Sequence, residues 1–222
     1  MDPKDDPYLT WMRFAIPGWL ASRNIDLMQR CITDLPGDDL PIVEIGSFSG
    51  LSTNVLRHLL RANERSNPVI SVDPWTFEGA SEGTIGTSTI TFAEYRRFVM
   101  ESFMRNTRFF SGDALPFHVE TNADSFFAQW RAKADVTDLF GATRRLGGPI
   151  AMAYIDGEHS YEASRRDFEN VDAALTVGGY IIFDDSADTT DWGCRQTAQE
   201  VAALSRYQVI DRQFNYCVRK IA

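Results

Sequence analysis

Cysteine is scarce in this sequence: the 222 residues include only Cys31, Cys194 and Cys217. The number is odd, the spacing is wide and no Cys-x-x-Cys pair occurs, so neither a disulfide framework nor a zinc site is predicted. No apolar run approaches the roughly 18 residues of a membrane span. The acidic start, MDPKDDP, lacks the apolar stretch of a secretory signal. We therefore expect a cytoplasmic protein that has no membrane partner.

Positively charged residues are also few. The sequence has 22 Lys and Arg residues against 31 Asp and Glu residues, which gives a net charge of −9. Such a balance argues against binding along a phosphate backbone, and we expect no nucleic-acid partner. The hydrophobic share of 44% and charged share of 24% are those of a folded globular chain. At roughly 150 residues per domain, the length predicts one α/β domain with additions.

Short apolar runs alternate with helical patterns along the chain. Helices are predicted over residues 22–35, 51–60, 91–106, 160–175 and 194–204, and within the less regular stretch 116–148. Strands are predicted over residues 41–46, 69–73, 108–113, 150–156 and 180–185, followed by a hairpin of 207–210 and 216–218. The pair Gly178-Gly179 is interpreted as a turn before the fifth strand. This alternation predicts a mainly parallel sheet with helices on its faces.

The predicted strands end on glycine or acidic residues. Gly46 follows the first, Asp73 the second, Asp156 the fourth, and Asp184-Asp185 the fifth. Open parallel sheets bind ligands beyond the carboxyl ends of their strands. These residues therefore predict a glycine-lined, acidic crevice.

The first strand-to-helix turn reads Glu44-Ile-Gly-Ser-Phe-Ser-Gly-Leu-Ser-Thr53. A dinucleotide fingerprint needs glycine where Phe48 stands, a nucleophile elbow needs serine there, and a P-loop needs Gly-Lys-Ser/Thr. What remains is Glu-x-Gly-x-x-x-Gly, which is either a ligand-binding turn or an ordinary tight turn. Asp73 has two interpretations as well: its carboxylate can accept the two hydroxyls of a ribose, or it is a solvated turn residue.

Asp156, Asp184 and Asp185 predict a metal centre. Carboxylates at adjacent strand ends repel one another unless a cation or protons intervene, and hard divalent cations prefer oxygen ligands. Consecutive strand residues point to opposite faces, so Asp184 and Asp185 can share an ion only if the chain turns there. The alternative is that one of the two caps the next element or faces solvent.

His159 follows Asp156 by three residues, at the mouth of the predicted crevice. A histidine suits proton transfer near neutral pH, although it could equally cap the helix over 160–175. Glu158 is a second candidate base or an outer partner of the metal.

The first 21 residues form a segment distinct from the domain over residues 22–222. Its apolar residues are Trp11, Phe14, Ile16, Trp19 and Leu20. The segment is either a lid over the acceptor pocket, or it packs against the core or a subunit partner.

Four stretches, VEIGSFSGLST, ISVDPW, YIDGEHSYE and GGYIIFDD, resemble the class I S-adenosylmethionine-dependent methyltransferases. Within that class they are most similar to the metal-dependent O-methyltransferases of natural-product pathways, such as the macrocin and mycinamicin enzymes and the cephalosporin hydroxylase-like family. The resemblance runs from about Gly18 to Arg219.

The resemblance implies a Rossmann-like, doubly wound α/β/α fold, with a seven-stranded, mostly parallel sheet whose last strand is antiparallel. It implies methyl transfer from S-adenosylmethionine to a hydroxyl of a small secondary metabolite, aided by Mg²⁺ or another hard divalent cation, in a homodimer or larger homo-oligomer. The residues that would contact the cofactor are Glu44, Gly46, Ser47, Phe48, Ser52, Asp73, Trp75, Asp113, Ala114 and Asp156.

Within that set, Ser52 would hold the methionine carboxylate, Asp73 the ribose, and Asp113 with Ala114 the adenine. Asp156, Asp184 and Asp185 match the metal ligands and His159 the general base. The alternatives are a metal-independent methyltransferase that uses His159 or Glu158, and a cofactor-binding partner without catalysis. Residues 76–90 and 116–148 depart from the family pattern, so the acceptor is left open.

Overall fold

Seven strands form one sheet in the computed structural model, which describes residues 3–77, 82–112 and 114–222. Their spatial order is β3-β2-β1-β6-β7-β9-β8. These strands are β1 Ile42–Ile45, β2 Val69–Val72, β3 Phe117–Val119, β6 Ile150–Ile155, β7 Leu175–Phe183, β8 Tyr207–Asp211 and β9 Cys217–Lys220. Neighbours are parallel except at β9, which is antiparallel to both β7 and β8. The predicted doubly wound sheet and its antiparallel last strand are confirmed.

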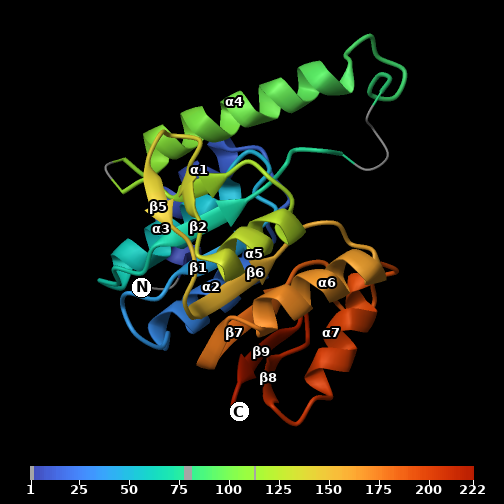
Figure 1. Ribbon diagram of the computed structural model, residues 1–222. Helices are drawn as coiled ribbons and strands as arrows, with labels where there is room; N and C mark the ends of the chain where they lie inside the picture. Colours follow the sequence, from blue (N-terminus) through green and yellow to red (C-terminus); the bar gives the residue numbers. More distant parts are fainter. Residues whose placement is uncertain (1–2, 78–81, 113) are drawn as a thin grey trace.

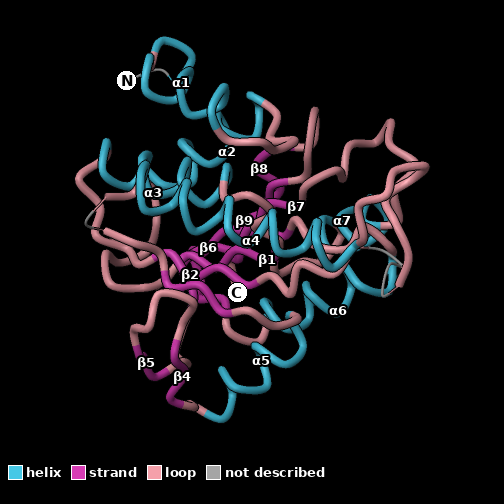
Figure 2. The backbone as a smooth tube through the Cα atoms, turned by 90° about the horizontal axis from the view of Figure 1, so that it is seen from above, coloured by secondary structure: helices cyan, strands magenta, loops and turns pink. Residues whose placement is uncertain are grey.

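Helices cover both faces of this sheet, as Figures 1 and 2 show. On one side lie α1 Pro7–Ala15, α2 Ser22–Thr33, α3 Leu51–Ala62 and α4 Phe92–Phe110, after the short 3-10 turn Pro3–Asp5. On the other side lie α5 Ala123–Ala132, α6 Tyr161–Asp172 and α7 Cys194–Ala202. A small antiparallel hairpin, β4 Asp135–Thr137 and β5 Thr143–Arg145, stands apart from the sheet.

The pleat of the strands separates the core into two layers. Ile42 packs with α1, α2 and α3, whereas Val43 and Ile45 pack with α5, α6 and α7. All four residues of β1 are buried, which is why its sequence is continuously apolar except for Glu44. A central strand buried on both faces holds the following turn at a fixed place.

The prediction of the third strand, over residues 108–113, was wrong. Residues 108–110 continue α4, which starts at a capping box of Thr91 and Glu94. Buried residues at Val99, Phe103 and Thr107, four apart, keep one helical face against the protein through this region. The apolar pair at 109–110 imitates a strand, yet Phe109 is 80% exposed. The strand that pairs with β2 is instead β3, over Phe117–Val119.

The structure also changes two other predictions, one for the irregular stretch 116–148 and one for the pair Gly178-Gly179. The stretch 116–148 contains a helix as predicted, but also β3 and the hairpin β4–β5. Gly178-Gly179 is not a turn before the fifth strand, because β7 runs through it. The register between β6 and β7 shifts there, and Gly178 has φ of +88°. The pair is therefore a bulge within the strand.

The first 21 residues are divided between core and surface. Leu9, Met12 and Ile16 are buried in the same cluster as α2 and α3. Trp11 and Trp19 are 71% and 84% exposed. No helix in the described part of the chain is long and apolar enough to cross a membrane.

Gly46 ends β1 where the sheet allows no side chain. A Cβ atom there would lie 1.9 Å from the carbonyl oxygen of Asp156, and the φ angle of +84° is one that glycine favours. The ends of β1 and β6 thus meet at a glycine, which draws the turn after β1 toward Asp156.

Candidate active site

A cavity of about 980 Å³ opens at the carboxyl ends of the parallel strands. These strand ends lie on the right-hand side of Figure 1. Its walls are the segments that follow β1, β2, β3, β6 and β7, together with residues 17–20. The volume lies at the upper end of the roughly 300–1,000 Å³ range of small-molecule sites. The crevice predicted at these strand ends is therefore present.

Asp73 fixes the backbone of the glycine turn through hydrogen bonds. Its Oδ2 atom accepts the backbone N–H groups of Ser47 (2.8 Å) and Phe48 (2.9 Å), and its Oδ1 accepts that of Trp75 (2.7 Å). Burial nonetheless raises the pKa of Asp73 above its ordinary value. The side chain that was predicted to bind a ribose therefore fixes the backbone of the turn after β1 and of Trp75. It also lines the cavity.

Glu44 stands behind the turn and does not line the cavity. Thr53 donates to its Oε2 at 2.5 Å, while Oε1 is buried and has no hydrogen-bond partner among the described residues. Burial raises the pKa of Glu44 to about 7, against the hydrogen bonds from Ser52 and Thr53. Ser52 itself lines the cavity at the start of α3.

Asp156 and Asp184 form a close acidic pair at the floor of the cavity. Their carboxyl groups are within hydrogen-bonding reach, and burial together with the negative charge of Asp184 raises the pKa of Asp156 well above its ordinary value. Asp184 is held by two buried amides: Asn24 donates to its Oδ1, and Asn215 donates to the same atom at 2.8 Å.

The chain turns at Asp185, as sharing a site with Asp184 requires. Asp185 has φ of +47°, and its side chain is 53% exposed. The Nε2 atom of His159 lies 3.9 Å from both Asp156 Oδ1 and Asp185 Oδ2. The ring of Trp192 packs against the histidine with centroids 5.3 Å apart. His159 is thus between the two acids at the cavity wall, and the neighbouring Glu158 is exposed at its rim.

The donor set suits a hard divalent cation. Asp156, Asp184 and Asp185 offer oxygen ligands, and no ion pair in the described ranges joins them to lysine or arginine. The side chains do not form a complete set of metal ligands, because among the described residues no three acidic, histidine or cysteine side chains surround one point. The chemistry of the group fits a cation, while only Asp156 and Asp184 are in direct contact.

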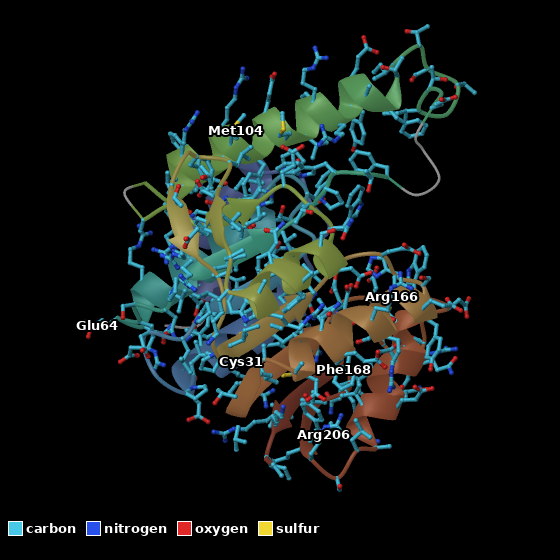
Figure 3. The ribbon with its side chains drawn as sticks, viewed as in Figure 1. Cys31, Glu64, Met104, Arg166, Phe168 and Arg206 are labelled. Carbon is cyan, nitrogen blue, oxygen red and sulfur yellow. The ribbon has the colours of Figure 1, made fainter. Side chains whose placement is uncertain are left out.

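Of the two residues predicted to contact adenine, Asp113 lies outside the described residues. Ala114 lies before β3, at the amino end of that strand, and is not among the described residues that line the cavity. Residues 122–124, which follow β3, do line the cavity. Arg166 of α6, labelled in Figure 3, pairs with Asp124 across this rim, with a Nε to Oδ2 distance of 3.5 Å.

Three side chains of the site have little or no signal in the sequence. They are Asn24, Trp192 and Asn215. Asn24 carries the clearest sign, because it interrupts the buried face of α2 that continues at Met28 and Cys31. A polar residue on an apolar helical face needs a buried partner.

Comparisons with known proteins identify a family for most of the chain. A family described as "Methyltransferase domain" matches residues 43–186. An uncharacterized protein of Acanthamoeba polyphaga mimivirus is 26% identical over 151 residues, which cover 68% of this chain. The chain spans about half (53%) of that relative.

Solved structures share the fold at low sequence identity. The calicheamicin methyltransferase CalS11 is 19% identical, with a TM-score of 0.57 over 89% of this chain and 77% of its own. An O-methyltransferase from Bacillus cereus, in complex with SAH, is 16% identical, with a TM-score of 0.57 over 98% and 92%. A putative O-methyltransferase from Klebsiella pneumoniae is 14% identical, with a TM-score of 0.59 over 98% and 91%.

Proposed function

The chain belongs to the methyltransferase domain family, and on this premise we propose that it is an S-adenosylmethionine-dependent O-methyltransferase acting on a hydroxyl group of a small, secondary-metabolite acceptor. One observation carries the proposal. The glycine turn, Asp73 and the group of Asp156 with His159 open into a single cavity of about 980 Å³. A nucleoside cofactor and a small acceptor need such a shared space.

The charge of the cavity supports the same cofactor. S-adenosylmethionine, when bound, supplies an electrophilic methyl group on a positively charged sulfur. Asp73 and Asp156 line the cavity and Glu44 lies behind it, so the site attracts a cation. Gly46 lines the cavity beside these acids, and residues 122–124, which follow β3, line it as well and would contact the adenine of the cofactor.

His159 is the residue that we propose as general base. Its Nε2 atom lies 3.9 Å from a carboxylate oxygen of Asp156 and from one of Asp185, and these two side chains would orient the ring at the cavity wall. The acceptor hydroxyl would give its proton to this nitrogen as its oxygen attacks the methyl group. Positioning supplies much of the remaining rate, because the reacting atoms must be held about 3 Å apart.

A divalent cation is the finer part of the proposal. Asp156, Asp184 and Asp185 would hold it, and when bound it would supply positive charge beside the acceptor oxygen. The alternative is transfer without a metal, which would not need three ligands to converge on one point, and none do so among the described residues. A small-molecule acceptor and a homo-oligomer complete the proposal. The exposed Trp11 and Phe14 of α1 support an oligomer contact.

The test begins with calorimetric titration of S-adenosylhomocysteine, with Mg²⁺ and with a chelator. We expect binding in both conditions, and its absence in both would contradict the proposed cofactor. A screen of hydroxylated acceptors then follows formation of S-adenosylhomocysteine by mass spectrometry. Loss of turnover in chelator, restored by Mg²⁺, supports the metal, whereas an unchanged rate supports metal-independent transfer.

A pair of histidine variants tests the base. His159→Gln should lose about 10²- to 10⁴-fold in turnover while it keeps its affinity for S-adenosylhomocysteine. The matched control is His58→Gln, because His58 pairs with Asp6 on the outer side of α3, away from the cavity. Equal losses in the two variants would argue against a role for His159 in proton transfer.

A further inference from the structure

Phe48 stands where a dinucleotide-binding turn would carry glycine, yet its backbone has the shape that glycine favours. Its φ angle is +43°, in the left-handed region that large side chains rarely adopt. Trp75, 27 residues later, is left-handed as well, with φ of +50°. Both residues line the cavity. Strained backbone that persists at a cavity needs surrounding contacts that hold it in place.

The contacts that hold Phe48 come from Asp73 and Trp75. The N–H of Phe48 donates to Asp73 Oδ2 at 2.9 Å, and the carbonyl of Phe48 accepts the indole Nε1–H of Trp75 at 2.9 Å. The backbone N–H of Trp75 donates to Asp73 Oδ1 at 2.7 Å. Both backbone polar groups of Phe48 are therefore fixed, one by each neighbour.

Trp75 is itself held rigidly. It is 1% exposed, its ring stacks on that of His118 with centroids 4.6 Å apart, and it meets the edge of Phe103 at 5.6 Å. The Nδ1 atom of His118 lies 2.8 Å from the hydroxyl of Ser71 in β2. The indole N–H is thus anchored to the sheet through packed rings, so it can define the position of the loop.

The held backbone places the Phe48 ring in the cavity wall. Its centroid lies 5.1 Å from that of Trp19 and 6.5 Å from that of Phe77. This row of rings comes from three separate segments and faces the cavity from the side of the glycine turn. Loss of the left-handed conformation would turn the ring out of that row.

We propose that Trp75 is a positioning residue for the cofactor, which acts through Phe48 by holding its carbonyl and so fixing the turn after β1 and the aromatic wall. This inference rests on the proposed function, because it takes the cavity to be the cofactor site. It goes beyond a contact role for Trp75, since the indole N–H would act through the carbonyl of Phe48.

The test compares two buried tryptophans that each donate to a backbone carbonyl. Trp130 is 4% exposed and donates from Nε1 to the carbonyl of Gly148 at 3.0 Å, away from the cavity. Trp75→Phe should weaken the affinity for S-adenosylhomocysteine about tenfold, while Trp130→Phe should leave it within twofold. Similar melting temperatures of the two variants would separate positioning from general stability. Unchanged affinity in a folded Trp75→Phe variant overturns the inference.

A double-mutant cycle tests whether Trp75 acts through Phe48. Glycine adopts the left-handed conformation without help, so in the Phe48→Gly background the Trp75→Phe change should alter affinity less than twofold. The same tenfold loss in both backgrounds would show that Trp75 acts directly and would overturn the proposal. Failure of Trp75→Phe and Trp75→Tyr to fold, when Trp130→Phe folds, would also overturn it by making Trp75 a core residue.

Hydrogen exchange separates this inference from the proposed function. If the wild-type protein does not bind S-adenosylhomocysteine, the proposed function fails, but amide exchange can still be measured without ligand. Exchange over residues 46–51 should be at least about tenfold faster in Trp75→Phe than in Trp130→Phe. Equal exchange in the two variants overturns the positioning role whatever the protein binds.

Discussion

Asn24 of α2 and Asp184 after β7, 160 residues apart in the sequence, are joined by a buried hydrogen bond at the floor of the cavity. Asn24 is fully buried, and its own Oδ1 accepts a hydrogen bond from Asn215 at 2.8 Å. Asn215 also donates to Asp184. Both asparagines lie outside residues 43–186, the part that matches the methyltransferase domain. Segments beyond that region therefore fix one of its acids.

Removing the Asn24 amide should weaken the cation binding proposed for the acidic group. In Asn24→Leu, Asn215 is the one side-chain donor to the Asp184 carboxylate that remains among the described residues. Loss of a partner that orients a ligand typically costs 10–100-fold in metal affinity. We expect Mn²⁺ to bind about tenfold more weakly by calorimetry, with little change for S-adenosylhomocysteine. Asn67→Leu is the control, because Asn67 is equally buried and its amide donates to the carbonyls of Gly37 and Leu40. A similar loss in the control would mean that both effects are structural.

Asp73→Ala should reduce both cofactor affinity and stability. Three backbone N–H groups lose their acceptor, and the turn that they hold lines the cavity. We expect affinity for S-adenosylhomocysteine to fall at least about tenfold, equal to 1.4 kcal/mol. Asp172→Ala serves as control. Asp172 is the last residue of α6, and its side chain accepts hydrogen bonds from Arg206 and Tyr207. The control should lose stability and keep affinity, and a loss of affinity in both would refute the specific role.

Gly46→Ala should be among the most destabilising single changes in the chain. The added methyl group would meet the carbonyl of Asp156 at 1.9 Å, in addition to the strain of φ at +84°. We expect a loss of more than about 3 kcal/mol in urea denaturation. Gly141→Ala is the control, because Gly141 has a similar φ of +88° but a Cβ atom added there would have no atom of the described residues within 4 Å. Its cost should be about 1 kcal/mol, so equal costs would rule out the steric explanation.

Glu44 should make the protein less stable as pH rises from about 4.5 to 7. Its pKa is raised from 4.5 to about 7 by burial, so over this range the unfolded chain loses its proton before the folded one. The unfolded state then binds fewer protons, and the free energy of unfolding falls with pH. Glu44→Gln should flatten this slope by up to about 2 kcal/mol between pH 5 and pH 7. The exposed Glu64→Gln should leave it unchanged, and an unaltered slope in Glu44→Gln would disprove the assignment.

Local pattern predicted most of the elements but not the third strand. The runs at β1, β2 and β6 are apolar and short, because both of their faces are covered. The end of α4 and the start of β3 were confused, because Phe109 and Phe110 are apolar without both being buried. The segment that enters the sheet is the one that pairs with β2. This pairing depends on contacts between residues distant in sequence, which a local pattern does not show.

The sequence by itself determined the alternation of strands and helices, and with it the edge where Gly46, Asp73, Asp156 and Asp184 meet. Strand order follows from that alternation, because right-handed crossovers leave few arrangements. Only the tertiary structure decided that Asn24 and Asn215 reach Asp184, and that Trp75 holds Phe48. Those contacts join segments far apart along the chain, and their geometry depends on side-chain packing that no local pattern encodes.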